Sequence, residues 1–243
     1  MDLPQVWLTK DGVPVILHGG DAGELNHHLP SLEETVYIFE LTLAELQTFD
    51  IGDGESVPTL EEVFVLTANH RLYLNIEVKA PHDLATRERY DYKLAIEKVQ
   101  TLIGKHGIRE CCVSSFDHDL LGELSRLNAK HGTQVEAIYL YNYYDHDELP
   151  SPEVYTALGR GINVSSRKLT REVVEACHAR GKVVGVWIDK DHAREDQDFY
   201  RAIFEMGVDF FCSDYPDRVY EALRNHYSLE QPVRMRFLSA SDM

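Results

Sequence analysis

The sequence predicts an α/β fold, a TIM-type (β/α)8 barrel, and three observations support this fold class. Short runs rich in β-branched and aromatic residues alternate with helical segments, which is typical of parallel strands joined by helical crossovers. Most of these runs are continuously apolar, as strands covered on both faces are. The chain has 243 residues, near the length of about 250 residues typical of such barrels. A doubly wound open sheet is the second interpretation.

Seven runs are predicted as strands, because Val, Ile, Phe and Tyr favour the extended conformation. They are residues 13–18, 72–78, 111–116, 135–141, 162–166, 182–188 and 208–213. An eight-fold barrel needs one strand more, and the shortfall lies at the N-terminus, where no helix precedes the first run. We therefore expect that the first strand and helix of the barrel are missing from this chain.

Local signals predict helices between these runs. Thr42 and Thr59 each precede a glutamate by three residues, which is the spacing of a capping box at a helix start. Apolar periodicity or a terminal glycine predicts further helices over residues 92–104, 119–130, 170–180 and 198–206.

The end of the chain has no sustained periodicity after residue 223. We therefore expect one domain over residues 1–227 and a loose tail over residues 228–243. No apolar run is long enough to cross a membrane and the start has no signal-peptide pattern, so a cytoplasmic protein is expected.

Composition and charge exclude several classes of function. The chain carries 41 acidic and 24 basic residues, a formal net charge of −17. Such a surface repels nucleic acid and anionic membranes. The four cysteines lack the spacing of a metal site, so they are predicted to be buried thiols.

Polar side chains interrupt or follow several predicted strands, and catalytic groups of barrel enzymes lie at the carboxyl ends of strands. His18 ends the first run, Glu77 lies inside the second and Lys79 follows it, while Trp187 and Asp214 lie at later strand ends. This set suits phosphate ester hydrolysis. A carboxylate can hold a divalent cation, a lysine can offset phosphoryl charge and a histidine can transfer a proton. The sequence contains no dinucleotide, P-loop or nucleophile-elbow motif.

Each of these residues also has a structural interpretation. His18 can be a strand-end histidine bonded to a carbonyl, and Glu77 with Lys79 can be a buried ion pair. Trp187 can belong to the core, and Asp214 can form a turn.

Three further polar segments are predicted to be solvated. His27 and His28 follow a polar loop and are expected to face solvent. Residues 50–56 and 189–198 are acidic, but each lacks ligand positions of a calcium loop.

Six segments occur in the order seen in glycerophosphodiester phosphodiesterases: LTKDGVPVILHGG, VPTLEEVF, LNIEVK, VSSFDHDLL, VVGVWI and GVDFFCSDYPD. Over residues 5–223 the chain resembles this family, in a eukaryotic branch. The resemblance implies a TIM-type barrel of the phosphatidylinositol-phosphodiesterase-like kind, incomplete at its N-terminus. It also implies cleavage of glycerophosphodiesters to glycerol 3-phosphate and an alcohol, in glycerophospholipid metabolism.

The resemblance further implies roles for individual residues. His18 matches the second of the family's two catalytic histidines, and Lys79 matches a lysine that contacts phosphate. Glu77 matches a metal ligand for Mg²⁺ or Ca²⁺, and Trp187 matches an aromatic residue of the substrate pocket. Asp214 matches an aspartate at the last strand, with a supporting role. The implied partner is a small-molecule phosphodiester.

The chain departs from the family pattern at its start. The first catalytic histidine has no counterpart, and Leu3 and Gln5 stand where the family has two metal-binding carboxylates. Because Glu77 alone would leave a hard cation most of its water shell, we expect weak metal binding. Departures confined to the start indicate N-terminal truncation rather than drift. Two hypotheses follow: a metal-dependent phosphodiesterase, or a catalytically inactive barrel that binds phosphodiesters or acts as a regulatory or interaction protein.

Overall fold

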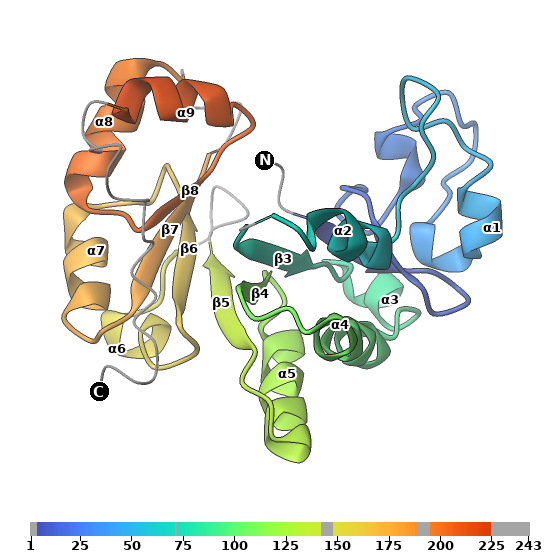
Figure 1. Cartoon of the computed structure of the whole chain (residues 1–243), viewed down its shortest axis with the longest axis horizontal. Helices are drawn as coiled ribbons and strands as arrows, with labels where there is room; N and C mark the ends of the chain where they lie inside the picture. Colours follow the sequence, from blue (N-terminus) through green and yellow to red (C-terminus); the bar gives the residue numbers. More distant parts are fainter. Residues whose placement is uncertain (1–3, 71, 142–147, 189–194, 225–243) are drawn as a thin grey trace. The chain divides into compact units, whose positions relative to one another are not determined.

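The computed structural model of the chain describes residues 4–70, 72–141, 148–188 and 195–224. The chain divides into two compact units (Figure 1). Among the described residues, the N-terminal unit lies within 4–138 and the C-terminal unit within 139–224. The predicted tail, residues 228–243, lies outside the described residues.

The strands of the N-terminal unit follow the order β2-β1-β3-β4. Their bounds are β1 (Gln5–Leu8), β2 (Pro14–Ile16), β3 (Leu74–Val78) and β4 (Cys111–Ser115). β1 pairs antiparallel with β2 and parallel with β3, and β3 pairs parallel with β4. Every residue of β4 and most residues of β3 are buried, which explains their apolar runs.

The expectation that the 13–18 run forms the first parallel strand is wrong. Its central residues form β2, which returns antiparallel along β1, so the described residues contain eight strands rather than the predicted seven. Thr9 holds the connecting turn, since its Oγ1 accepts a hydrogen bond from Val13 N at 2.9 Å and donates one to Asp11 Oδ1 at 2.6 Å. The sequence pattern missed β1 because it is four residues long and includes the polar Gln5.

The helices that local signals predict in the N-terminal unit are present at the predicted places. Thr42 and Thr59 both form complete capping boxes, each accepting a hydrogen bond from the amide three residues later. α4 packs against α2 and α5, and α5 packs against β4 (Figure 1). The bounds are η1 (Leu25–His27), η2 (Ile38–Glu40), α1 (Leu43–Leu46), α2 (Leu60–Thr67), α3 (Leu84–Arg87), α4 (Tyr92–His106) and α5 (His118–His131).

The C-terminal unit contains the parallel strands β6 (Gly161–Ser165), β7 (Val183–Trp187) and β8 (Phe210–Cys212), in that order. Its helices are α6 (Pro152–Tyr155), α7 (Arg171–His178), α8 (Gln197–Met206) and α9 (Pro216–Leu223). α7 packs against β7, and α8 packs against α9 (Figure 1). Strand β5 (Glu136–Tyr141) spans the division between the two units.

The cysteines are free thiols, and three of the four are buried as predicted. Burial raises the pKa of Cys111 to about 12 and that of Cys177 to about 11, so both thiols stay protonated at neutral pH. The prediction is wrong for Cys212, which is half-buried at the end of β8 and accepts a hydrogen bond from Asn163 Nδ2 at 3.2 Å. None of the described helices combines the length and the apolar character that crossing a bilayer requires.

Candidate active site

Three segments of the N-terminal unit converge at the end of β3. Gln5 of β1 stands opposite Glu77 of β3 in the parallel register. The amide of Leu17 donates a hydrogen bond to the carbonyl of Gln5 at 3.0 Å, which brings the end of β2 and the following His18 to the same place. The structure thus gathers His18, Glu77 and Lys79, the three predicted site residues of this unit.

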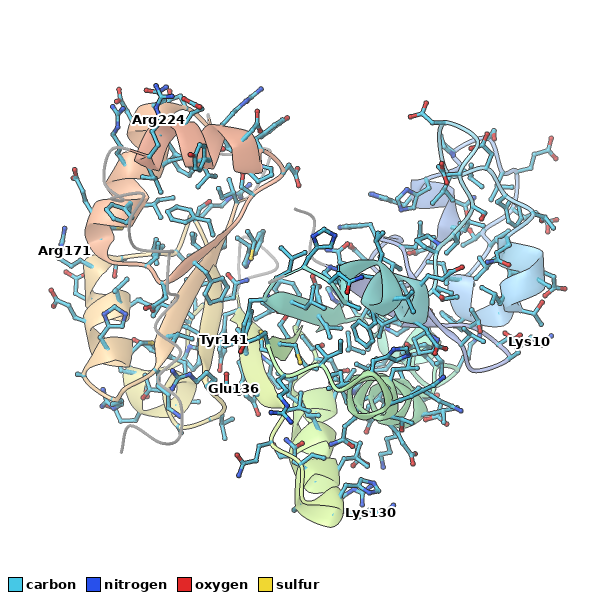
Figure 2. The ribbon with its side chains drawn as sticks, viewed as in Figure 1. Lys10, Lys130, Glu136, Tyr141, Arg171 and Arg224 are labelled. Atoms are coloured by element: carbon cyan, nitrogen blue, oxygen red, sulfur yellow. The ribbon has the colours of Figure 1, made fainter. Side chains whose placement is uncertain are left out.

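Glu77 and Lys79 form a buried ion pair. Lys79 Nζ lies 3.0 Å from Glu77 Oε1, and the two side chains are 11% and 4% exposed. The ammonium is not aligned for a hydrogen bond, and Oε1 accepts none within the described residues. The other carboxylate oxygen, Oε2, accepts a hydrogen bond from Gln5 Nε2 at 3.1 Å. The structural interpretation of a buried pair is therefore confirmed, and the pair also places a cation at the strand end. Lys130, by contrast, lies at the far end of α5, away from β3 (Figure 2).

His18 is held in a single tautomer. Its Nδ1 lies 2.6 Å from the carbonyl oxygen of Gly19. Since a carbonyl only accepts hydrogen bonds, Nδ1 carries the proton and Nε2 is the basic nitrogen. The residue is exposed to solvent on one side. Partial desolvation nevertheless lowers the pKa of His18 below its usual value, and the charge of Lys79 lowers it further, against smaller opposing effects from Gly19 and Glu77. His18 is therefore a neutral imidazole at pH 7.

Trp7 fixes the backbone that carries His18. This residue of β1 is fully buried, and its Nε1 donates a hydrogen bond to the carbonyl of His18 at 3.0 Å. Gly19 and Gly23 have positive φ and pass so close to the indole that a Cβ on either would lie 3.0 Å from a ring atom. Sequence reasoning missed Trp7 because it lies in the short strand that the pattern did not reveal.

The two histidines after this loop do not both face solvent. His27 is exposed, as expected, but its ring stacks on that of His18, with centroids 4.8 Å apart and planes inclined by 22°. The expectation is wrong for His28, which is half-buried and accepts a hydrogen bond from the amide of Gly19 at 3.4 Å. Partial desolvation and the neighbouring histidines lower the pKa of His28. His28 is thus used to hold the loop.

The other predicted site residues belong to the C-terminal unit. Trp187 ends β7 and is half-buried, and its Nε1 donates a hydrogen bond to the carbonyl of Tyr141 at 3.1 Å. With the indole N–H engaged, the aromatic face is what Trp187 can offer a ligand. Asp214 lies exposed in the bend before α9. Most of the acidic segment 189–198 lies outside the described residues.

The donor set does not fit a tightly held divalent cation. Within the described part of the chain, no three His, Cys, Asp or Glu side chains come together as a metal site. Glu77 supplies one carboxylate, whose charge Lys79 already offsets, and Gln5 is neutral. A hard cation takes about six to eight oxygen ligands, several of them carboxylates. Leu3, at the other carboxylate position of the family, lies outside the described residues.

Residues 5–218 match the profile of the "Glycerophosphoryl diester phosphodiesterase family". A protein from Caldanaerobacter subterraneus subsp. tengcongensis, named glycerophosphodiester phosphodiesterase, is 26% identical over 238 residues. The match covers 90% of this chain and 84% of that protein.

Solved structures also resemble the chain over most of its length. One from Galdieria sulphuraria, assigned to the same enzyme class, is 25% identical with a TM-score of 0.75, covering 91% of this chain and 84% of its own. A phosphodiesterase from Oleispira antarctica, solved with its product sn-glycerol-3-phosphate, is 22% identical with a TM-score of 0.72, covering 90% and 83%. These similarities confirm the predicted fold class, an α/β fold of the TIM-barrel type.

Proposed function

Because the chain belongs to the glycerophosphoryl diester phosphodiesterase family, we propose that it hydrolyses glycerophosphodiesters to glycerol 3-phosphate and an alcohol. The arrangement of His18, Lys79 and Glu77 supports this proposal. The neutral imidazole of His18 lies in the electrostatic reach of the buried pair formed by Lys79 and Glu77. A proton acceptor next to a buried cation is what an anionic phosphodiester requires for hydrolysis.

Each residue of this site has a distinct part in the proposal. His18 exchanges a proton through Nε2, because its Nδ1 is committed to the Gly19 carbonyl. Lys79 offsets the negative charge on the phosphoryl oxygens, and Glu77 holds the ammonium in place. For Trp187, in the C-terminal unit, the family resemblance supports a role in substrate binding.

Enzymes of this family are generally dependent on a divalent cation. When bound, such an ion supplies positive charge to the phosphoryl oxygens. Glu77 is the carboxylate of this site through which Mg²⁺ or Ca²⁺ would bind, and a single carboxylate paired with a lysine holds such ions weakly. His18 and Lys79 therefore carry the proposed chemistry of this chain.

A second function is supported by the same donor set. With one carboxylate at the site, the chain has in Lys79 a cation that can bind a phosphodiester without cleaving it. In this alternative, the protein is a catalytically inactive barrel with a regulatory or interaction role.

Release of glycerol 3-phosphate from glycerophosphocholine by the full chain, with and without Mg²⁺ or Ca²⁺, separates the two functions. We expect turnover, and a loss of about 100-fold or more in His18→Ala. His131→Ala, at the exposed end of α5, is the matched control and should leave the rate unchanged. Saturable binding by calorimetry without turnover would favour the second function. Absence of both binding and turnover would exclude both.

A further inference from the structure

We propose that His27 is a second acid–base catalyst, which acts together with His18 on the same phosphodiester. This inference deepens the proposed function and rests on it. The observation behind it is the stacking of the two imidazole rings, 4.8 Å apart and inclined by 22°.

Hydrogen bonds of neighbouring residues fix the backbone next to His27. His27 ends the short helix η1, whose first residue, Leu25, is fully buried. The side chain of Asn26 donates hydrogen bonds to two backbone carbonyls, at 3.2 and 2.9 Å, and accepts one from the amide of Val36 at 2.9 Å. The residues on the N-terminal side of His27 are therefore anchored, and the ring of His27 stacks on that of His18.

His27 differs from its neighbour His28 in what its ring nitrogens do. The Nε2 of His28 accepts the hydrogen bond of the Gly19 amide, so this histidine maintains the loop. The ring of His27 makes no hydrogen bond or ion pair within the described residues, and the residue is exposed. Water and substrate can therefore reach His27, and its nitrogens are available for proton transfer.

Hydrolysis of a phosphodiester requires two proton transfers, since the entering water loses a proton and the leaving alcohol gains one. One histidine performs only one of these transfers at a time. Two rings stacked with their centroids 4.8 Å apart are close enough to act on two oxygens of one phosphodiester.

In this reaction His18 is the base and His27 the acid. The water oxygen forms a bond to phosphorus while His18 Nε2 accepts a water proton, and the bond from phosphorus to the alcohol oxygen breaks. The His27 imidazolium donates its proton to that oxygen. His18 ends protonated and His27 neutral, and exchange with solvent restores the starting states. The charges around His18 support this division, because desolvation, Lys79 and the charge of His27 keep His18 neutral, with Glu77 opposing.

Dependence on the leaving group tests the inference. His27→Phe keeps a ring for stacking but cannot donate a proton, and it is compared on glycerophosphocholine and on the p-nitrophenyl ester of glycerol 3-phosphate. We expect kcat for glycerophosphocholine to fall about 100-fold, because choline is a poor leaving group that needs an acid. The p-nitrophenyl ester should lose less than about 5-fold, since p-nitrophenolate leaves without a proton.

His28→Phe is the matched control, because it alters the loop without removing the proposed acid. It should lower the rates on both substrates by the same factor. Equal losses on both substrates in His27→Phe, or an unchanged rate, would overturn the inference while leaving the proposed function intact. An unsubstituted chain that hydrolyses neither substrate would overturn the proposed function, and the inference with it.

Discussion

The two residues of the buried ion pair, Lys79 and Glu77, shift the pKa of His18 in opposite directions. The charge of Lys79 lowers the pKa of His18, and the charge of Glu77 raises it. In Lys79→Met the pKa of His18 should therefore rise, so that the acidic limb of the rate profile moves toward neutral pH. In Glu77→Gln the pKa should fall, and the acidic limb should move to lower pH. NMR titration of the His18 ring measures both shifts directly.

Loss of Lys79 should also lower the rate and the stability. Removing one electrostatic group at a phosphoryl site costs about 100-fold in kcat. Breaking a buried pair costs about 3–5 kcal/mol in the free energy of unfolding, which denaturant titration measures. Glu221→Gln is the control, because the pair it breaks with Arg224 is exposed, with side chains that are 49% and 55% exposed. Shifts of the His18 pKa in the same direction in Lys79→Met and Glu77→Gln would contradict this account.

Part of the candidate site could be predicted residue by residue. His18, Glu77 and Lys79 stand out because they are polar groups within or directly after apolar strand runs, where an uncompensated charge is costly. The roles of Trp7 and His27 could not be predicted in this way. They depend on contacts across the loop after β2, which the local sequence does not encode.

At the scale of elements, β1 and the loop after β2 meet at Trp7. Trp7→Phe removes the hydrogen bond to the His18 carbonyl but keeps an aromatic ring in the core. Tyr90→Phe, in the same cluster, removes the hydroxyl that accepts a hydrogen bond from the amide of Leu8 at 3.1 Å. Each variant should lose about 1–3 kcal/mol in the free energy of unfolding. Only Trp7→Phe should also lower kcat, because only Trp7 contacts the backbone of His18.

Denaturant titration and steady-state kinetics of both variants check this expectation. The chemical shift of the His18 ring provides an additional measurement, since a loosened loop alters the ring environment. Equal changes of kcat in the two variants would show that Trp7 acts through general stability alone.

Helices that begin at a capping motif were predicted correctly from the sequence. Strand β1, which is defined by its pairing with other strands, was not. The helix starts at Thr42 and Thr59 depend on side chains within one turn, so four-residue motifs in the sequence sufficed. β1 is defined by its pairing with β2 and with β3, whose residues lie about seventy positions away along the chain. A four-residue run carries too little periodicity to reveal such pairing.

At the scale of the whole molecule, the alternation of strands and helices predicted the fold class correctly. Every predicted strand from residue 72 onward corresponds to an observed strand, with bounds shifted by at most two residues. Apart from β8, whose three residues are half-buried, these strands are mostly buried and apolar, so their residue types indicate them. The net charge of −17 can also be read from the sequence. This charge affects the rate at which charged substrates associate with the protein, but it does not determine the fold.

This charge makes a prediction about salt that depends on the charge of the substrate. Glycerophosphocholine has no net charge, whereas glycerophosphoglycerol carries one negative charge, which a chain of net charge −17 repels at long range. Raising the ionic strength from about 0.01 M to about 0.15 M shortens the screening length from about 30 Å to about 8 Å and weakens this repulsion. We expect kcat/KM for glycerophosphoglycerol to rise with salt, while kcat/KM for glycerophosphocholine stays nearly constant. Steady-state kinetics at both ionic strengths measure the difference. A fall of kcat/KM with salt for the anionic diester would show instead that the local charge of Lys79 outweighs the net charge of the chain during association.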